Sequence, residues 1–268
     1  MRLNALKRLW AAGGAAVNGW LAIPSSFAAE TMAHQGWDSL TVDLQHGVND
    51  YATAIPMLQA ISTTAVTPLA RVPWLDEGIC MKMLDAGCYG LICPMIDSPA
   101  DAERFVAACR YPPLGRRSFG PIRASLYGGP DYAAGANDEI LLFAMIETRG
   151  ALDRLDDILA VPGLDAVYIG PADLSAALGC TPKFDQEEKP VVEAIELVVR
   201  RARERGIVAG IHNGTPAYAL KMIERGFQFV TIASDARLLA AKAGEVVGEM
   251  RRGLKRAPGA EAAARTGY

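Results

Sequence analysis

Short apolar runs rich in β-branched and aromatic residues alternate with longer amphipathic stretches along most of this chain. The apolar runs predict eight strands, over Gly19–Pro24, Ser39–Leu44, Pro68–Val72, Gly90–Met95, Leu141–Ile146, Ala166–Gly170, Val208–Ile211 and Phe229–Ala233. Helical periodicity predicts helices between them, over Asp50–Ser62, Glu77–Ala86, Ala100–Cys109, Leu152–Ala160, Pro190–Arg205, Pro216–Glu224 and Asp235–Arg251. This alternation is typical of successive βα units wound around a parallel sheet.

The number and spacing of these units favour one closed barrel. Eight βα units within about 235 residues match the (β/α)8, or TIM, barrel, which is an α/β fold. We predict a single barrel domain over residues 1–256, with an N-terminal helix, Leu3–Ala12, that caps the barrel bottom or packs on a neighbour. An open doubly wound sheet is the alternative, but no GxGxxG turn follows the first strand. The Ala- and Gly-rich segment 257–268 is predicted to be a disordered tail.

One connection, Tyr111–Asp138, is much longer than most of the others. Loops of this length are uncommon in compact domains, and those that occur are often binding loops or lids. Helical patterning is weak in this segment, which begins with Tyr111-Pro-Pro-Leu-Gly. We predict that part of it forms a lid.

The composition indicates a partner that is a small molecule. With 268 residues, of which 51% are hydrophobic, the chain can bury one large core. Its formal net charge of −3 gives no general electrostatic reason to bind nucleic acid or an anionic membrane. Five cysteines form no CxxC pair and leave one over, which disfavours a disulfide framework or a zinc ribbon and indicates the reducing cytoplasm.

The N-terminal segment Met1–Trp10 resembles the charged start of a secretory signal, and Ala11–Val17 is apolar. Gly13-Gly14 and Asn18 interrupt this apolar stretch, so no signal peptide is predicted. A run of about 18 apolar residues is also missing from the sequence, so no membrane span is expected.

Two carboxylates follow successive predicted strands. Glu147 closes the run Leu141–Ile146, and Asp173 follows Tyr168-Ile-Gly-Pro-Ala. If these runs are adjacent parallel strands, both acids emerge on one rim, where they could supply the hard oxygen ligands that a divalent cation requires. The sequence therefore predicts a metal site. Each acid could instead lie near a helix N-terminus as a capping residue.

Other predicted strand ends add polar side chains to the same rim. They are Asp43, Gln45, His46, Arg71, His212, Asn213, Ser234 and Asp235. His46 stands at a strand-to-loop transition and is predicted to act as a general base. Asp43, three residues earlier, is expected to hydrogen-bond the imidazole and fix its tautomer, although it could instead accept backbone donors of the turn.

Arg71 would place a guanidinium inside the rim, where burial without an anionic partner is costly. A salt bridge to Asp43 or Glu147 would satisfy it, and so would a carboxylate or enolate oxygen of a substrate. Gly170-Pro-Ala-Asp173 forms a short turn into a helix N-terminus, where backbone N–H groups can bind a carboxylate. Together these residues predict a site that binds and polarises a 2-oxo acid.

Several segments, in this order, resemble the HpcH/HpaI class II pyruvate aldolases, which include 4-hydroxy-2-oxoheptanedioate aldolases and are related to the lyase subunit of citrate lyase. The resemblance extends from about Gly19 to Val247. It is most specific at Val42–Asp50, Arg71–Trp74, Leu84–Gly87, Cys93–Met95, Arg110–Arg116, Ile146–Arg149 and Ile169–Ser175.

The resemblance implies a TIM barrel that is commonly a homohexamer, a trimer of dimers whose subunits exchange their last helix. It implies a divalent metal, Mg²⁺, Mn²⁺ or Co²⁺, held by Glu147 and Asp173. His46, oriented by Asp43, matches the acid/base histidine, and Arg71 matches the arginine that stabilises the enolate oxygen. The remaining matches are the pyruvate-carboxylate cradle of Gly170, Pro171, Ala172 and Asp173, the aldehyde-pocket aromatic Trp20, and Asp85, an acid contributed across the subunit boundary.

Two positions depart from the pattern of many relatives. Gln45 stands where they have Glu directly before the histidine, and Met145 stands where they often have Gln two residues before the metal-binding Glu. The change at Met145 removes a polar contact to the ketoacid or its water, and is expected to shift donor preference or rate.

The implied reaction is a reversible cleavage of a 4-hydroxy-2-oxo acid into pyruvate and an aldehyde. The metal serves as Lewis acid, and His46 removes the C4 hydroxyl proton, directly or through a water. One alternative is a carbon–carbon lyase acting on acyl-coenzyme A, for which Arg116, Arg117 and Arg123 are the nearby basic cluster. The other is a non-catalytic ketoacid- or metal-binding barrel. The sequence leaves open the aldehyde, the choice between pyruvate and hydroxypyruvate, the native metal and the subunit number.

Overall fold

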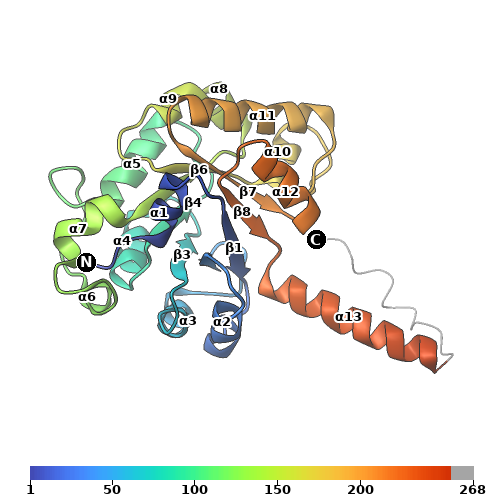
Figure 1. Ribbon diagram of the computed structural model, residues 1–268. Helices are drawn as coiled ribbons and strands as arrows, with labels where there is room; N and C mark the ends of the chain where they lie inside the picture. The colour runs from blue at the N-terminus through green and yellow to red at the C-terminus, as the bar shows by residue number, and fades with distance from the viewer. Residues whose placement is uncertain (255–268) are drawn as a thin grey trace.

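Eight parallel strands close into one barrel in chain order, and β8 pairs with β1 to complete it. The computed structural model describes residues 1–254 (Figure 1). The strands are β1 (Ala16–Leu21), β2 (Ser39–Asp43), β3 (Thr67–Arg71), β4 (Gly90–Cys93), β5 (Leu141–Met145), β6 (Ala166–Ile169), β7 (Val208–Asn213) and β8 (Phe229–Ile232). The predicted (β/α)8 fold is confirmed, while the predicted tail 257–268 lies outside the described residues.

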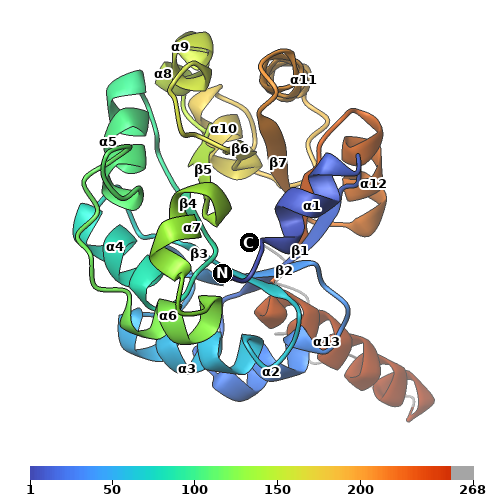
Figure 2. The ribbon, with the colours of Figure 1, turned by 60° about the vertical axis from the view of Figure 1, so that its left-hand side comes forward.

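Helices form a ring around the barrel, which Figure 2 shows. The helices of the described residues, including α1 and α13 outside this ring, are α1 (Ala5–Ala11), α2 (Ser26–Ala33), α3 (Tyr51–Ile61), α4 (Glu77–Asp85), α5 (Pro99–Cys109), α6 (Ile122–Gly128), α7 (Tyr132–Glu139), α8 (Arg149–Asp153), α9 (Leu155–Leu159), α10 (Pro171–Ala177), α11 (Lys189–Glu204), α12 (Pro216–Glu224) and α13 (Asp235–Gly253). Many begin after a Ser, Thr, Asp or Asn whose side chain accepts a backbone N–H, as at Asp50, Ser98 and Thr215.

Seven of the eight strands begin within one residue of their predicted start, and β1 is the exception. It begins at Ala16, because the apolar stretch after α1 already belongs to the sheet, with Asn18 pairing Ser39. The prediction Leu152–Ala160 corresponds to two short helices, α8 and α9, and α2 was not predicted.

Inward-facing side chains fill the barrel, and α1 covers its lower end. Leu6 of α1 is fully buried among them, and the Trp10 ring packs edge-on against Phe143 and Phe229, with centroids 6.1 and 6.3 Å away. The predicted capping of the barrel bottom by the N-terminal helix is therefore confirmed. Because this end is closed by side chains, the strand carboxyl ends are the open end of the barrel.

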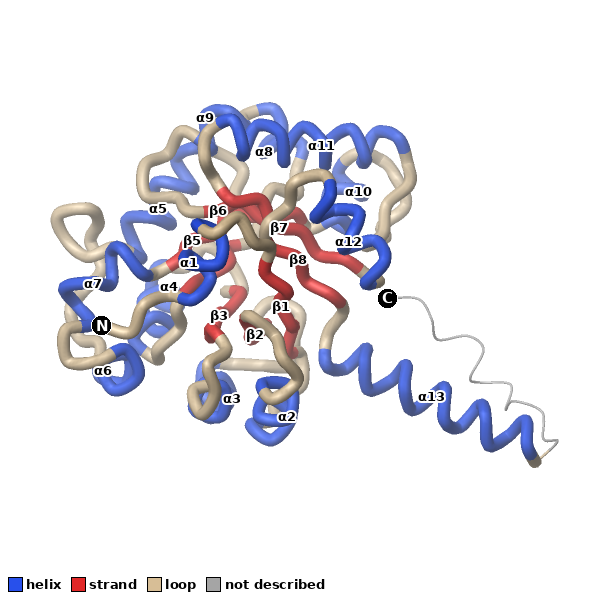
Figure 3. The backbone as a smooth tube through the Cα atoms, viewed as in Figure 1, coloured by secondary structure: helices blue, strands red, loops and turns tan. Residues whose placement is uncertain are grey.

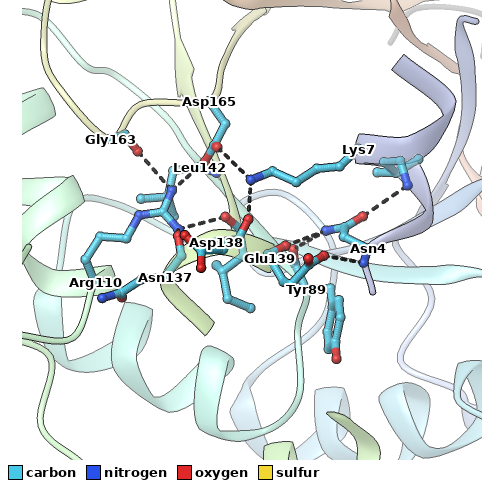
Figure 4. Close-up of polar contacts among 12 residues, drawn as sticks. Asn4, Lys7, Tyr89, Arg110, Asn137, Asp138, Glu139, Leu142, Gly163 and Asp165 are labelled. Carbon is cyan, nitrogen blue, oxygen red and sulfur yellow. Dashed lines mark hydrogen bonds and ion pairs between the residues drawn. The ribbon is translucent and has the colours of Figure 1, made fainter. Parts of the chain in front are cut away.

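The long connection Tyr111–Asp138 does not reach that open end. It follows α5 and precedes β5, so it lies where strands begin, and it contains α6 and most of α7. Figure 4 shows it there with the N-terminus, where Asn4 Nδ2 donates to the Glu139 carbonyl at 2.8 Å and Lys7 donates to the Asp138 carbonyl. The prediction of a lid over the site was wrong, because position in a βα unit decides which end of the barrel a loop covers.

Helix α13 extends away from the barrel (Figures 1 and 3). Asp235, its first residue, is the one buried residue of this helix, whereas large apolar side chains further along are exposed, among them Leu239, Val247 and Met250. Among the described residues, no helix combines the length and apolar character that crossing a membrane would require.

Candidate active site

Glu147 lies directly after β5 and turns its carboxylate into the open end of the barrel. Its side chain is buried, at 2% exposure, and Oε1 accepts the Met95 backbone N–H at 2.9 Å. Met95 follows β4 with φ of 55°, a left-handed conformation that is uncommon for a residue other than glycine. This turn directs the N–H of one strand end towards the carboxylate of the next.

Burial, together with the negative charge of Asp173, raises the pKa of Glu147 to about 7, against the opposing effects of the Met95 N–H and the Arg71 charge. Asp173 lies in the first turn of α10 and is exposed. The structure thus brings the two predicted metal ligands to one place, as the adjacency of β5 and β6 requires.

Gly170, the residue before α10, makes close approach of the Glu147 carboxylate possible. A Cβ at this position would clash with Glu147 Oε2 and would stand 3.0 Å from the Met145 methyl group. Glycine is therefore required here by the carboxylate that packs on it. The predicted cradle Gly170–Asp173 and the two predicted metal ligands share this corner of the rim.

This donor set fits a hard divalent cation. Among residues 1–254 there is no cluster of three or more His, Cys, Asp and Glu side chains with metal-binding spacing. Mg²⁺ is commonly held by one or two carboxylates with water and substrate oxygens in the other positions. Two neighbouring carboxylates, one of them hard to ionise because it is buried, would be stabilised by such an ion.

Asp43 and Arg71, at the ends of the neighbouring strands β2 and β3, form a buried bidentate ion pair. Arg71 Nε and Nη2 donate to the two Asp43 oxygens at 2.8 and 2.7 Å, and the guanidinium lies 4.8 Å from the Trp20 ring centroid. Burial alone would raise the pKa of Asp43, but the hydrogen bonds and charge of Arg71 hold it below the usual range. The pair fixes a guanidinium whose positive charge acts on Glu147, against the burial that raises the pKa of that carboxyl group.

The expected hydrogen bond between Asp43 and the His46 imidazole is not found among the described residues. The Asp43 carboxylate instead accepts the backbone N–H groups of Gln45, His46 and Gly47, at 3.1, 3.4 and 3.1 Å. This is the alternative left open by the sequence, with Arg71 added. Asp43 therefore shapes the loop that carries His46, and the imidazole itself is exposed on the rim.

Asp85 does not lie with these residues in one chain. It is the last residue of α4, at the end of the helix remote from the carboxyl end of β3, and it pairs with Arg117 at 2.6 Å. Ser234 and Asp235 also have structural contacts: Ser234 caps α13, and Asp235 accepts the backbone N–H groups of Ala22 and Ile23.

Trp20 lies beside Arg71, and its ring stacks on a residue that the sequence analysis did not single out. The Tyr168 ring is 5.9 Å from the Trp20 ring and nearly parallel to it, at 12°. Tyr168 Oη donates to Thr231 Oγ1 at 2.8 Å and lies 3.1 Å from His212 Nδ1. The sequence could have indicated this position, because side chains alternate along a strand and Tyr168 stands two residues after Ala166, which faces the barrel interior.

The two departures from the family pattern lie beside this centre. Met145 is buried, at 1% exposure, and packs next to Gly170. The Gln45 side-chain carbonyl is buried without a hydrogen-bond partner among the described residues. Next to Gly170 and Glu147, Met145 thus presents an apolar side chain where the resemblance implies a polar one.

Comparison with known proteins places this geometry in a family. The model of the HpcH/HpaI aldolase/citrate lyase family matches residues 19–241. The chain is 41% identical over 249 residues to a hydroxypyruvate/pyruvate aldolase of Rhizorhabdus wittichii, across 93% of this chain and 99% of that one. It is 38% identical over 240 residues to a 4-hydroxy-2-oxo-heptane-1,7-dioate aldolase of Salmonella dublin, across 88% and 90%. An HpcH/HpaI aldolase/citrate lyase family protein from Burkholderia cenocepacia superposes with a TM-score of 0.86 at 31% identity, across 92% of this chain and 99% of that one.

A closed barrel with two carboxylates and a fixed arginine at its open end, related in sequence to aldolases over most of its length, defines a TIM-barrel carbon–carbon lyase. The chain belongs to the HpcH/HpaI aldolase/citrate lyase family. Within that family its relatives identify it as a class II aldolase.

Proposed function

We propose that the chain catalyses reversible cleavage of a 4-hydroxy-2-oxo acid to pyruvate and an aldehyde, with a divalent cation held by Glu147 and Asp173. The observation that supports this best is the buried Glu147 carboxylate, with its raised pKa, beside a second carboxylate and facing Arg71. Mg²⁺, Mn²⁺ and Co²⁺ all accept such oxygen ligands. When bound, the ion supplies Lewis acidity towards the oxygens of the 2-oxo acid.

Arg71 stabilises the negative charge that develops on the keto oxygen when the C3–C4 bond breaks. Its guanidinium is already oriented by Asp43 and Trp20, so little reorganisation is required at the moment of reaction. The backbone of Gly170, Pro171, Ala172 and Asp173 binds the substrate carboxylate at the start of α10. Trp20 and Tyr168 wall the site and exclude water from it.

His46 removes the C4 hydroxyl proton, directly or through a water, and returns a proton in the reverse reaction. Its position on the loop after β2 supports this role, because the loop is held by Asp43 and by Asn49, whose Nδ2 donates to the Leu21 and Asp43 carbonyls at 3.0 Å. After release of the aldehyde, protonation of the enolate gives pyruvate.

The names of the relatives indicate which ketoacid serves as the donor in the aldol reaction. Proteins similar to this chain over most of its length are called hydroxypyruvate/pyruvate aldolases, and others are called 4-hydroxy-2-oxo-heptane-1,7-dioate aldolases. We infer that pyruvate is a donor, and that hydroxypyruvate is a second one to be tested beside it. Met145 in place of a polar residue is the feature of this site expected to influence the choice.

The acyl-coenzyme A alternative is disfavoured by the basic cluster on which it relied. Arg117 is buried and paired with Asp85, Arg116 pairs with Glu77, and Arg123 donates to the Ala86 carbonyl. These arginines lie among the outer helices and are engaged with the protein itself. A purely structural metal is disfavoured because it would require neither Arg71 nor His46.

We propose a homohexamer, a trimer of dimers, in which α13 is exchanged between subunits and Asp85 approaches the site of a neighbour. Support comes from the exposed apolar side chains of α13, which one subunit leaves without a covering surface. We also propose a cytoplasmic location, since all five cysteines are unpaired, as a reducing compartment favours.

The experiment that tests the function is an aldol assay under metal control. Purified protein is incubated with a 4-hydroxy-2-oxo acid, and pyruvate release is followed with a coupled dehydrogenase. We expect release to stop in excess chelator and to return when Mg²⁺ or Mn²⁺ exceeds the chelator. Full activity in excess chelator would contradict the metal role, and absence of pyruvate release under every metal condition would contradict the proposed function.

His46→Ala is expected to lower kcat by about 10²–10⁴-fold, the usual contribution of positioned proton transfer. Pyruvate affinity should change much less, because His46 handles the hydroxyl proton and not the ketoacid. Steady-state kinetics with pyruvate inhibition constants measures both quantities. His34→Ala, which removes an exposed histidine far from the rim, is the matched control. An unchanged kcat in His46→Ala would remove this residue from the mechanism.

A further inference from the structure

A continuous run of aromatic rings leads from Arg71 to a second arginine on the same rim. The Arg71 guanidinium lies 4.8 Å from the Trp20 ring, and Trp20 meets the His212 ring edge-on at 5.2 Å. The His212 ring is 4.7 Å from Phe184, and the Arg237 guanidinium lies 4.6 Å from the Phe184 ring. Two strands, β1 and β7, and the loop of Phe184 thus supply the rings of a wall that has an arginine at each end.

The loop that carries Phe184 is fixed to this rim. Asp185 accepts the Gly214 backbone N–H and the Thr215 hydroxyl, both at 2.7 Å, at the carboxyl end of β7. Phe184 is therefore positioned next to His212, which belongs to β7. The aromatic wall is a built feature of the site and not a chance contact of a free loop.

His212 lies between the two arginines and is held as a neutral ring. Its Nδ1 is 3.1 Å from the Tyr168 hydroxyl, which donates its proton to Thr231. Burial, followed by the positive charge of Arg71 and Arg237 and against the charge of Asp43, lowers the pKa of His212 to about 3. The middle of the wall is thus uncharged, and positive charge is confined to its ends.

Arg237 has no anionic partner in the part of the chain from 1 to 254. Among these residues the hydrogen bond recorded for Arg237 comes from its backbone N–H, which donates to Ser234 Oγ, and the contact recorded for its guanidinium is the Phe184 ring. Asp235, two residues before Arg237, and Asp185, next to Phe184 in sequence, have other partners, since Asp235 binds backbone N–H groups and Asp185 binds the β7 loop. The planar guanidinium of an arginine that is stacked on an aromatic ring can donate two parallel N–H hydrogen bonds to a carboxylate or phosphate.

In the proposed reaction Arg71 contacts the ketoacid part of the substrate. The aromatic wall leads away from Arg71, so it is placed to line the aldehyde part. We propose that Arg237 binds the terminal anionic group, a carboxylate or phosphate, of the aldehyde, and so determines which aldehydes this enzyme prefers. Trp20, His212 and Phe184 line the uncharged segment between the aldehyde carbon and that group. This inference rests on the proposed aldol reaction.

The test compares aldehydes that differ in terminal charge. The full-length enzyme, with pyruvate and Mn²⁺, is assayed with 4-oxobutanoate against butanal and with glyceraldehyde 3-phosphate against glyceraldehyde. For each pair the measured quantity is the ratio of kcat/KM values, anionic over neutral. We expect Arg237→Gln to lower at least one of these ratios by roughly tenfold to a hundredfold, mainly through KM, as removal of a charge-assisted hydrogen bond predicts.

Two further variants separate a direct contact from other effects. Arg237→Lys should recover part of the preference, because a positive charge remains. Arg149→Gln removes an exposed charge after β5, on the same rim, and should leave both ratios as in the wild type. The pair that responds to Arg237→Gln identifies the terminal group as carboxylate or phosphate.

Two results would overturn the role of Arg237 while leaving the aldol function in place. One is that Arg237→Gln keeps the wild-type ratios of kcat/KM for anionic over neutral aldehydes. The other is that Arg149→Gln lowers these ratios as much as Arg237→Gln does. If no aldehyde of either kind supports turnover in the wild-type protein, the proposed function itself fails and this inference falls with it.

Discussion

Glu147→Gln should lower metal-dependent aldol turnover by on the order of a thousandfold or more, because it neutralises the buried ligand of the ion that polarises the ketone. The exchange keeps the size of the side chain, so the contact with Met95 and the close approach to Gly170 can remain. The metal-free variant should be at least as stable as the wild type, since a buried carboxylate beside a second carboxylate is replaced by a neutral amide. Initial rates at saturating Mn²⁺ and thermal unfolding in chelator measure the two effects.

The matched control for this variant is Glu193→Gln, which removes an exposed carboxylate of α11. It should retain wild-type turnover and metal response. A Glu147→Gln enzyme with more than about a tenth of wild-type turnover would show that the ion, if one is used, is not bound by Glu147 in the way proposed here.

Arg71→Met should lower turnover by about a hundredfold to a thousandfold, the range seen when one donor to a developing oxyanion is removed. It should also lower the free energy of unfolding by about 3–5 kcal/mol, because the Asp43 carboxylate is left buried without its partner. Denaturant unfolding and steady-state kinetics measure these losses separately.

The double variant Asp43→Asn with Arg71→Met distinguishes the structural contribution of this pair from the catalytic one. Removing both charges should recover much of the lost stability, since no unpaired charge remains buried. Turnover should stay low, because the guanidinium is still missing. Recovery of turnover along with stability would mean that Arg71 acts only by holding the fold together.

Most of the fold can be predicted from the pattern of apolar residues. Strands of a buried parallel sheet appear in the sequence as short runs of apolar, β-branched residues, and this pattern does not depend on which strands lie next to them. β1 begins before its predicted start because Ala16 and Val17, at the end of the apolar stretch Ala11–Val17, already pair with β8. The polar side chain of Asn18 does not end the strand, since it is buried and donates to Thr231. The function of the Tyr111–Asp138 segment was misjudged for a different reason. Its length alone predicts a lid, whereas its place between a helix and the next strand assigns it to the opposite end of the barrel.

The site was predictable where a residue's place at a strand end determines its position. Glu147, Asp173, Arg71 and Trp20 meet at the rim because their strands all end at the same open end of one closed parallel barrel. The partner of Asp43 could not be decided from spacing alone, because a guanidinium across the strand pair competes with an imidazole three residues away.

Other contributions to the site leave little trace in the sequence. The left-handed turn at Met95 is set by packing around β4, since methionine has no intrinsic preference for it. Phe184 and Arg237 reach the rim from a loop and from the start of a helix, and their approach depends on how those segments fold back over the barrel. Contacts of this kind become visible only in three dimensions.

The measurement that tests the central claim most directly is calorimetric titration of Mn²⁺ into metal-free wild-type, Glu147→Gln and Asp173→Asn proteins, with and without pyruvate. A site formed by Glu147 and Asp173 predicts one ion per chain in the wild type, tighter binding when pyruvate is present, and affinity weakened by about a hundredfold or more in either variant. Wild-type affinity and an undiminished response to pyruvate in both variants would contradict it, because the ion would then bind at another position.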